Sequence, residues 1–195
     1  GREAASAVDA IAALVDGFDP DRVLARDAMD LVEVFSRLEH LASAGVALAA
    51  RKVAQTDLWR QGGHSSAAHW LSHTTGMSVG EAVGLLQTAE VVEAAPDTFD
   101  ALKAGKVSTR QARAIGAAEK ADPEAGRRLL AAVEERSTKE TETAAARIVR
   151  AASTETEAER AERVRRSRHL RTWVDTDGAG HGTFVLPPAE FTKLM

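Results

Sequence analysis

The chain has 195 residues, of which 44% are hydrophobic and 28% charged, with a formal net charge of −4. This balance allows a sizeable globular core and excludes a protein that coats nucleic acid by bulk positive charge alone. The absence of cysteine excludes disulfides, thiolate nucleophiles and cysteine-ligated zinc. Because no apolar run approaches the ~20 residues of a membrane-spanning helix and no signal-peptide pattern opens the chain, we expect a cytoplasmic protein without membrane contact.

Helical periodicity dominates the first segment, residues 1–62. The first predicted helix ends at Gly17, and its apolar face carries Val8, Ile11, Ala12 and Val15. A longer helix is predicted from Asp27 to Arg60, on the order of 50 Å long. Its apolar stripe consists of Leu31, Phe35, Leu38, Ala42, Val46, Ala49 and Val53. Such a stripe is typical of a core helix in a bundle, and the alternative is a homodimer seam along residues 27–60.

In the remaining segments, capping residues predict where the helices begin. Three capping boxes are predicted, at Ser78 with Glu81, Ser108 with Gln111, and Ser137 with Glu140. Asp122 followed by Pro123 predicts a further helix start. The expected order is a helix-turn-helix-like region at 63–121, a helical hairpin with a long charged helix at 122–168, and a β-hairpin with the start of a truncated helix at 169–195. The predicted fold is a mainly α multi-helix bundle with one β-hairpin near the C-terminus, cut from a longer protein.

Residues 63–90 predict two short helices joined at Gly76, a spacing found in DNA-binding helix-turn-helix pairs and also in ordinary bundles. In the second helix, the predicted buried stripe is Val79, Ala82, Val83, Leu86 and Ala89. Its predicted exposed face is Gly80, Glu81, Gly84, Gln87 and Thr88, without a cation. We expect DNA contacts from Ser78, Gln87 and Thr88, since glutamine can pair with adenine.

Affinity for a duplex depends on phosphate neutralisation, so cations must come from outside this helix. The candidates are Lys103, Lys106, Arg110 and Arg113, which lie beside the predicted Ser108 helix start, a suitable place for a phosphate. A solvated basic face is an equally good interpretation. A second, denser cluster consists of Arg163, Arg165, Arg166, Arg168 and Arg171. There we favour ion pairing with the acidic stretch 155–162 over a nucleic-acid contact.

Catalytic chemistry is not evident in these residues. His64, His69 and His73 lack a converging carboxylate, so we favour hydrogen-bonded or solvent-facing histidines over a metal site. The stretch from Asp175 resembles a calcium loop, but Ala179 and Leu186 stand where oxygen ligands belong. We expect no catalytic residue, metal site or cofactor here, and an autonomous enzyme ranks last among the function classes.

A run of about fifty residues resembles a known DNA-binding region. The matching residues are Thr75-Gly76-Met77-Ser78, Leu85-Leu86, Pro96, Gly105-Lys106-Val107-Ser108 and Gln111-Ala112. Through them, residues 65–113 resemble the helix-turn-helix of ParB-type partition proteins. The departure is the lack of a cation on the recognition helix.

A broader resemblance spans roughly residues 25 to 195. It rests on Leu38 with the alanine-rich helix, Gly63-x-Ser65, Trp70-Leu71, Thr75-Gly76-x-Ser78, Ala82, Pro96, Ala101-Leu102-x-x-Gly105-x-Val107-Ser108, Gln111-Ala112, and Asp177-Gly178 ahead of Leu186-Pro187. These residues resemble the thirteen-E-twelve repeat family of high-GC bacteria, domains of unknown function whose members typically carry a C-terminal HNH endonuclease module.

The resemblance implies that this chain is the non-catalytic N-terminal part of an HNH endonuclease, and that any divalent metal belongs to the nuclease module. The leading hypothesis is then a DNA-binding or targeting domain with DNA as partner. The alternative is a structural or dimerisation module without direct DNA contact.

Overall fold

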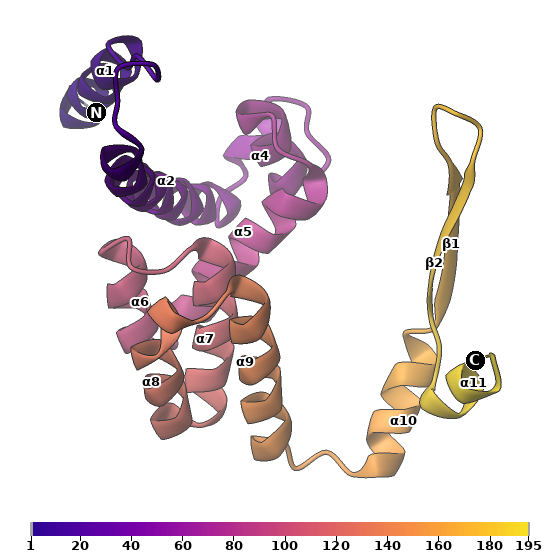
Figure 1. Cartoon of the computed structure of the whole chain (residues 1–195). Helices are drawn as coiled ribbons and strands as arrows, with labels where there is room; N and C mark the ends of the chain where they lie inside the picture. The colour runs from indigo at the N-terminus through magenta and orange to yellow at the C-terminus, as the bar shows by residue number, and fades with distance from the viewer. Residues whose placement is uncertain (1, 195) are drawn as a thin grey trace. The chain divides into compact units, whose positions relative to one another are not determined.

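The computed structural model describes residues 2–194. They form two compact units, and the boundary along the chain falls between Val149 and Arg150 (Figure 1). Within the described residues there are eleven α-helices, one 3-10 turn and a single two-stranded antiparallel sheet. The predicted class, mainly α with one β-hairpin near the C-terminus, is confirmed.

The first unit contains α1 (Arg2–Asp16), α2 (Ala25–Ala54), α3 (Leu58–Gln61), α4 (Ala67–Thr75), α5 (Val79–Val92), α6 (Pro96–Lys103), α7 (Thr109–Ala121), α8 (Pro123–Ala131), the 3-10 turn η1 (Val133–Glu135) and most of α9 (Thr138–Ala152). The second unit contains α10 (Glu157–Arg166), β1 (His169–Val174), β2 (Gly180–Val185) and α11 (Pro188–Leu194). None of the helices within residues 2–194 is both long enough and apolar enough to cross a membrane.

The predicted capping residues position the helix starts. Ser78 and Ser108 each form a reciprocal capping box. Ser137 makes the same pair of contacts with Glu140. Asp122 accepts a hydrogen bond from Ala125 N–H at 3.0 Å, with proline following it at the first helical position. These starts are confirmed because capping is decided within four residues of chain.

Two helix lengths were predicted wrongly. The long helix α2 ends at Ala54 rather than Arg60, because the Thr56 hydroxyl donates to the Val53 carbonyl and accepts from Leu58 N–H, which replaces the next helical turn. The long charged helix expected within 122–168 is two helices, α9 and α10. Thr156 interrupts it by forming a fourth capping box with Glu159, which begins a new helix.

The core of the first unit has two parts. One cluster lies among α5 to α9, together with Ala44 of α2, and includes Val92, Leu102, Val107 and Ile115, each with no exposed surface. The other joins α2, α4 and α5 through five alanines and two leucines: Ala47, Ala50, Ala68, Leu71, Ala82, Leu85 and Ala89. The small side chains of α2 let α5 approach closely, so the second half of α2 is a core helix.

A buried carboxylate holds the start of α6. The residue before this helix, Ala95, has no side chain that could cap it. Glu119 of α7 supplies the cap instead: it accepts hydrogen bonds from the backbone N–H of Asp97 and of Thr98, at 3.1 and 3.0 Å, and from the Thr98 hydroxyl at 2.6 Å. This contact locks α6 to α7 and has no counterpart in the sequence-based expectations.

The middle of α2 is attached to the turn between α6 and α7. Arg37 Nε donates to the Ala104 carbonyl at 3.3 Å, and the His40 ring lies 3.3 Å from the Gly105 carbonyl. Gly105 has φ of +68°, and a Cβ there would lie 2.8 Å from Cγ of Leu41. Glycine is therefore required at this contact both by backbone conformation and by space.

The hairpin of the second unit has two chemically different faces. β1 pairs antiparallel with β2 so that His169 lies opposite Val185 and Val174 opposite Gly180. Because side chains alternate along a strand, one face carries His169, Arg171, Trp173, His181, Thr183 and Val185, and the other carries Leu170, Thr172, Val174 and Phe184. All twelve strand residues are exposed.

Candidate interaction surfaces

The two short helices predicted in residues 63–90 are α4 and α5, joined at Gly76. α4 ends at Gly76, whose φ of +76° terminates the helix in the left-handed conformation. Ser78 then begins α5: its hydroxyl accepts from Glu81 N–H at 3.2 Å, and its own N–H donates to the Glu81 carboxylate at 2.8 Å. These hydrogen bonds lower the pKa of Glu81, so a carboxylate stands at the start of the predicted recognition helix.

The face of α5 differs from the predicted one. Thr88 was expected to be exposed and to contact DNA, and this is wrong: only 1% of its surface is exposed. Its hydroxyl donates to the carbonyls of Gly84 and Thr109, at 2.9 and 3.1 Å, which joins α5 to α7. The predicted buried positions Val79 and Val83 are each 40% exposed. The buried stripe is instead Ala82, Leu85, Thr88, Ala89 and Val92.

Of the four predicted cations, Arg113 is the one that reaches α5. Its Nη1 lies 3.5 Å from Oε1 of the exposed Gln87. A Cβ at Gly84 would lie 2.8 Å from the same nitrogen, so the missing side chain of Gly84 makes room for the guanidinium. The α5 face, which carries no cation of its own, therefore receives a positive charge from α7.

The other three cations are directed elsewhere. Lys103 Nζ lies 2.9 Å from Asp100 of its own helix and over the Phe99 ring. Lys106 lines an open groove between α6 and α8. Arg110 makes a bidentate contact with Glu142 of α9, with its shortest distance 3.0 Å. The four candidate cations therefore do not converge beside the Ser78 helix, because α6, α7 and the loop between them present their cations to different neighbours.

The arginine cluster of the second unit follows the ion-pair interpretation in part. Arg163 forms a bidentate contact with Glu155, and Arg165 and Arg166 both donate to Glu162. These contacts raise the pKa of Arg163 and Arg165 and lower the pKa of both glutamates. For Arg168 and Arg171, by contrast, residues 2–194 offer no ion pair, and both are exposed.

The three histidines of the helix pair do not converge on a metal site. His69 interacts with the Ser65 hydroxyl through Nδ1. The rings of His64 and His73 lie 5.2 Å apart, tilted at 54°. Across the described part of the chain, no group of three or more histidine, aspartate or glutamate side chains could hold a metal ion together.

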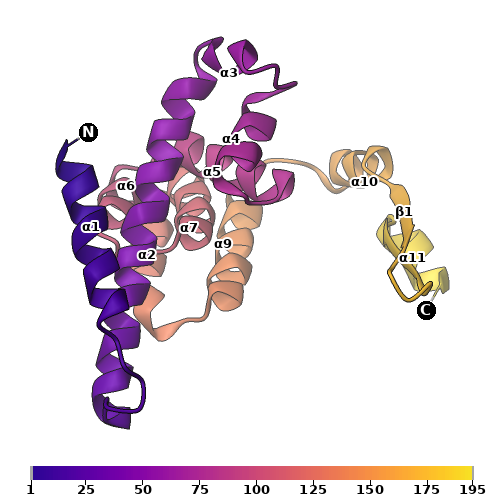
Figure 2. The same ribbon diagram turned by 90° about the horizontal axis from the view of Figure 1, so that it is seen from above.

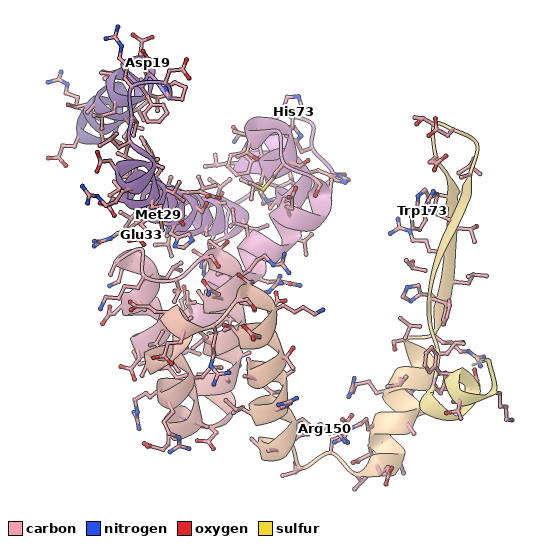
Figure 3. All side chains as sticks on the ribbon, in the orientation of Figure 1. Asp19, Met29, Glu33, His73, Arg150 and Trp173 are labelled. Atoms are coloured by element: carbon pink, nitrogen blue, oxygen red, sulfur yellow. The ribbon has the colours of Figure 1, made fainter. Side chains whose placement is uncertain are left out.

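A large apolar surface covers α1 and the first half of α2. α1 has no buried residue, and α2 has none before Ala44. The ribbons of both helices can be followed in Figure 2. Nine large apolar side chains in this region are between 38% and 69% exposed: Val8, Leu14, Val15, Phe18, Leu24, Met29, Val32, Val34 and Leu41. Met29 and Glu33 in Figure 3 mark its position on α2. We call this region the N-terminal apolar surface.

A groove crosses the N-terminal apolar surface. It has a volume of about 660 Å³ and runs between the end of α1 and the start of α2. Its lining residues are Val15, Phe18, Ala28, Leu31, Val32, Phe35, Ser36 and Glu39. Sequence periodicity had placed three of these residues on apolar stripes: Val15 of α1, and Leu31 and Phe35 of α2. What periodicity did not reveal is that, within the described part of the first unit, α1 has no buried residue and α2 has none before Ala44.

Comparison with known proteins gives no further guide, since no family model, no curated protein and no solved structure matches the chain.

Proposed function

We propose that this chain is a non-catalytic association module, which pairs with a second copy of itself through the N-terminal apolar surface. The observation that carries the proposal is α1, a helix of 15 residues in which no residue is buried. Isolated helices of this length are marginal in water, and an amphipathic helix gains its stability by burying its apolar face. We therefore expect another surface to cover the apolar face of α1.

The size of the surface suits a stable interface. A fully exposed apolar side chain presents about 60–120 Å², so nine partly exposed ones offer a few hundred Å² per copy. A standard interface buries ~800 Å² per partner, of which about 60% is apolar. An exposed apolar area of several hundred Å² often marks an interaction site.

A second copy fits because each chain carries both complementary parts. The groove lined by Val15, Leu31 and Phe35 accepts an amphipathic helix, and α1 is an amphipathic helix without a buried face. A two-fold axis would place each copy's α1 against the other's groove and cover both at once. In the family that the sequence resembles, such pairing would bring two HNH modules together.

Sedimentation equilibrium tests the proposal on the 195-residue chain, whose mass is 20.7 kDa. We expect twice this mass for the wild type. Val32→Glu should give a monomer, because it buries a carboxylate in the apolar interface. Val174→Glu is the matched control, since both valines are 68% exposed and Val174 lies in the second unit. A monomeric wild type, or dimers in both variants, would refute the pairing.

A second function, DNA binding by α4–α5, is favoured by the Arg113 guanidinium beside Gln87. Titration of a duplex at several salt concentrations tests it. Arg113→Ala should weaken binding and reduce the salt slope by about one. Arg110→Ala, whose guanidinium is held by Glu142, should leave both unchanged. Equal effects of the two substitutions, or none, would remove α4–α5 as the DNA site.

A further inference from the structure

The hairpin of the second unit turns a polar, aromatic face away from its apolar one. Phe184, on the apolar face, meets Phe191 of α11 with ring centroids 6.3 Å apart, so α11 approaches from that side. The opposite face carries His169, Arg171 and Trp173 along β1, and Figure 3 shows Trp173 projecting from the strand. We call this the aromatic–basic face. It is open on the side away from α11.

Trp173 is held in a fixed orientation at this face. Its ring is stacked on His181 across the strands, with centroids 5.5 Å apart and planes 11° from parallel. The His181 ring lies 2.6 Å from the Asp175 carboxylate, which also accepts hydrogen bonds from the backbone N–H groups of Asp177 and Ala179. These contacts lower the pKa of Asp175, so the carboxylate stays ionised. The turn thereby fixes His181, and His181 fixes the indole.

About half of the Trp173 surface remains exposed after this stacking. Arg171 lies on the same face, two residues earlier, at a spacing of about 6.6–6.8 Å along the strand. Arg168 precedes the strand. Within residues 2–194, neither arginine has a carboxylate partner, in contrast to Arg163, Arg165 and Arg166. An ordered aromatic ring, with the unpaired Arg171 guanidinium on the same face, is therefore available to a ligand.

We propose that the aromatic–basic face of the hairpin binds single-stranded nucleic acid. An unpaired base stacks on Trp173, and Arg171 contacts a neighbouring phosphate. Proteins hold single strands by this combination of aromatic stacking and backbone neutralisation. A duplex conceals the faces of its bases, so stacking on Trp173 favours a single strand. An acidic protein partner would use the guanidinium groups but gain less from a flat indole.

Fluorescence anisotropy with a labelled oligothymidine, and with a duplex of the same length, tests this inference on the whole chain. We expect tighter binding of the single strand. Trp173→Ala should weaken it about tenfold to a hundredfold, the loss typical of one stacked base. Trp173→Phe keeps an aromatic ring and should restore most of the affinity, which separates stacking from a folding defect.

The charge contribution has its own matched pair of variants. Arg171→Ala should reduce the slope of log affinity against log salt by about 0.7, the value for one phosphate contact on a single strand. Arg147→Ala removes an exposed cation from α9 in the first unit and should leave the slope unchanged. Unaltered single-strand binding in Trp173→Ala, or an equal loss of duplex and single-strand binding in this variant, would overturn the inference. Arg113→Ala should not affect it, so this site and α4–α5 are tested separately.

Discussion

The α5–α9 core and the N-terminal apolar surface are built from similar amphipathic helices, yet they differ in completeness. In the core, Leu102 and Ile115 have no exposed surface and the start of α6 is capped by a buried glutamate. On the N-terminal apolar surface, large side chains such as Val8 and Met29 are about two-thirds exposed. The comparison shows that an apolar stripe predicts a helix face that will be buried. The stripe does not tell whether another part of the same chain or a second molecule buries it.

The largest effect should come from truncating the core. Leu102→Ala removes a side chain with no exposed surface, so we expect a loss of about 2–5 kcal/mol in the free energy of unfolding, from lost burial and the remaining cavity. Urea denaturation followed by circular dichroism measures it. A loss below about 1 kcal/mol would mean that the α5–α9 core is loosely packed and that the contrast between the two regions is weaker than described.

The buried cap of α6 should rank next. Glu119→Gln keeps the shape of the side chain but replaces one accepting oxygen by a donor facing the N–H groups of Asp97 and Thr98. We expect a loss of about 1.5–3 kcal/mol, typical of hydrogen bonds to a charged group. Glu124→Gln on α8 is the control, because Glu124 forms surface ion pairs that contribute little. Equal losses would argue against the role of Glu119 as a cap.

A smaller effect is expected at the start of α9. Ser137→Ala removes the hydroxyl that accepts from Glu140 N–H, and should cost about 1 kcal/mol. Ser137→Gly, which lacks the hydroxyl but suits the cap backbone, should cost only a few tenths. Thermal unfolding of the two variants compares them. If neither substitution lowered the melting temperature, side-chain capping would not be the reason that α9 begins there.

The same cap should be sensitive to acid. Hydrogen bonds from Ser137 lower the pKa of Glu140 in the folded chain, so this contact stabilises above the unfolded pKa and the stabilisation is lost as pH falls through the folded one. Glu140→Gln should therefore be less stable than the wild type at neutral pH, with the difference shrinking toward acid pH. Urea midpoints measured across the pH range check this. A difference that grows on acidification would contradict the sign.

The smallest effect should be Leu14→Ala on α1. Leu14 is 63% exposed, so in a dilute, monomeric sample the free energy of unfolding should change by less than about 0.5 kcal/mol. The same chemical change is thus expected to be severe at Leu102 and nearly silent at Leu14. Denaturation at low protein concentration makes the comparison. A loss above about 1 kcal/mol would show that α1 is covered within its own chain.

What the sequence could predict was mostly local. Ser78 and Ser108 cap their helices with partners three residues away, and the alternation from His169 to Val174 was sufficient to place the hairpin. The cap of α6 was not predictable in this way, because Glu119 lies more than twenty residues from the N–H groups it binds. Its position depends on how α7 packs against α6.

The candidate DNA site shows the same limit. The residue spacing identified Arg110 and Arg113 as neighbours on one helix, but only the packing decides that Arg110 meets Glu142 of α9 and Arg113 meets Gly84 of α5. Thr88 was misassigned because the α5 stripe was taken as Val79 and Val83, while α7 covers α5 on the side of Thr88. Periodicity predicts that a helix has a buried face. The packing of neighbouring helices decides which residues lie on that face.

The contact between α2 and Gly105 has a mechanical consequence. The helix extends from His40 to Ala25 beyond it, about 22 Å at 1.5 Å per residue. If α2 tilted by about 10° about its contact with Gly105, its N-terminal end at Ala25 would move by roughly 4 Å. A methyl group at Gly105 would press against Leu41 and would therefore shift the position of the N-terminal end of α2, although no residue of α2 itself is changed.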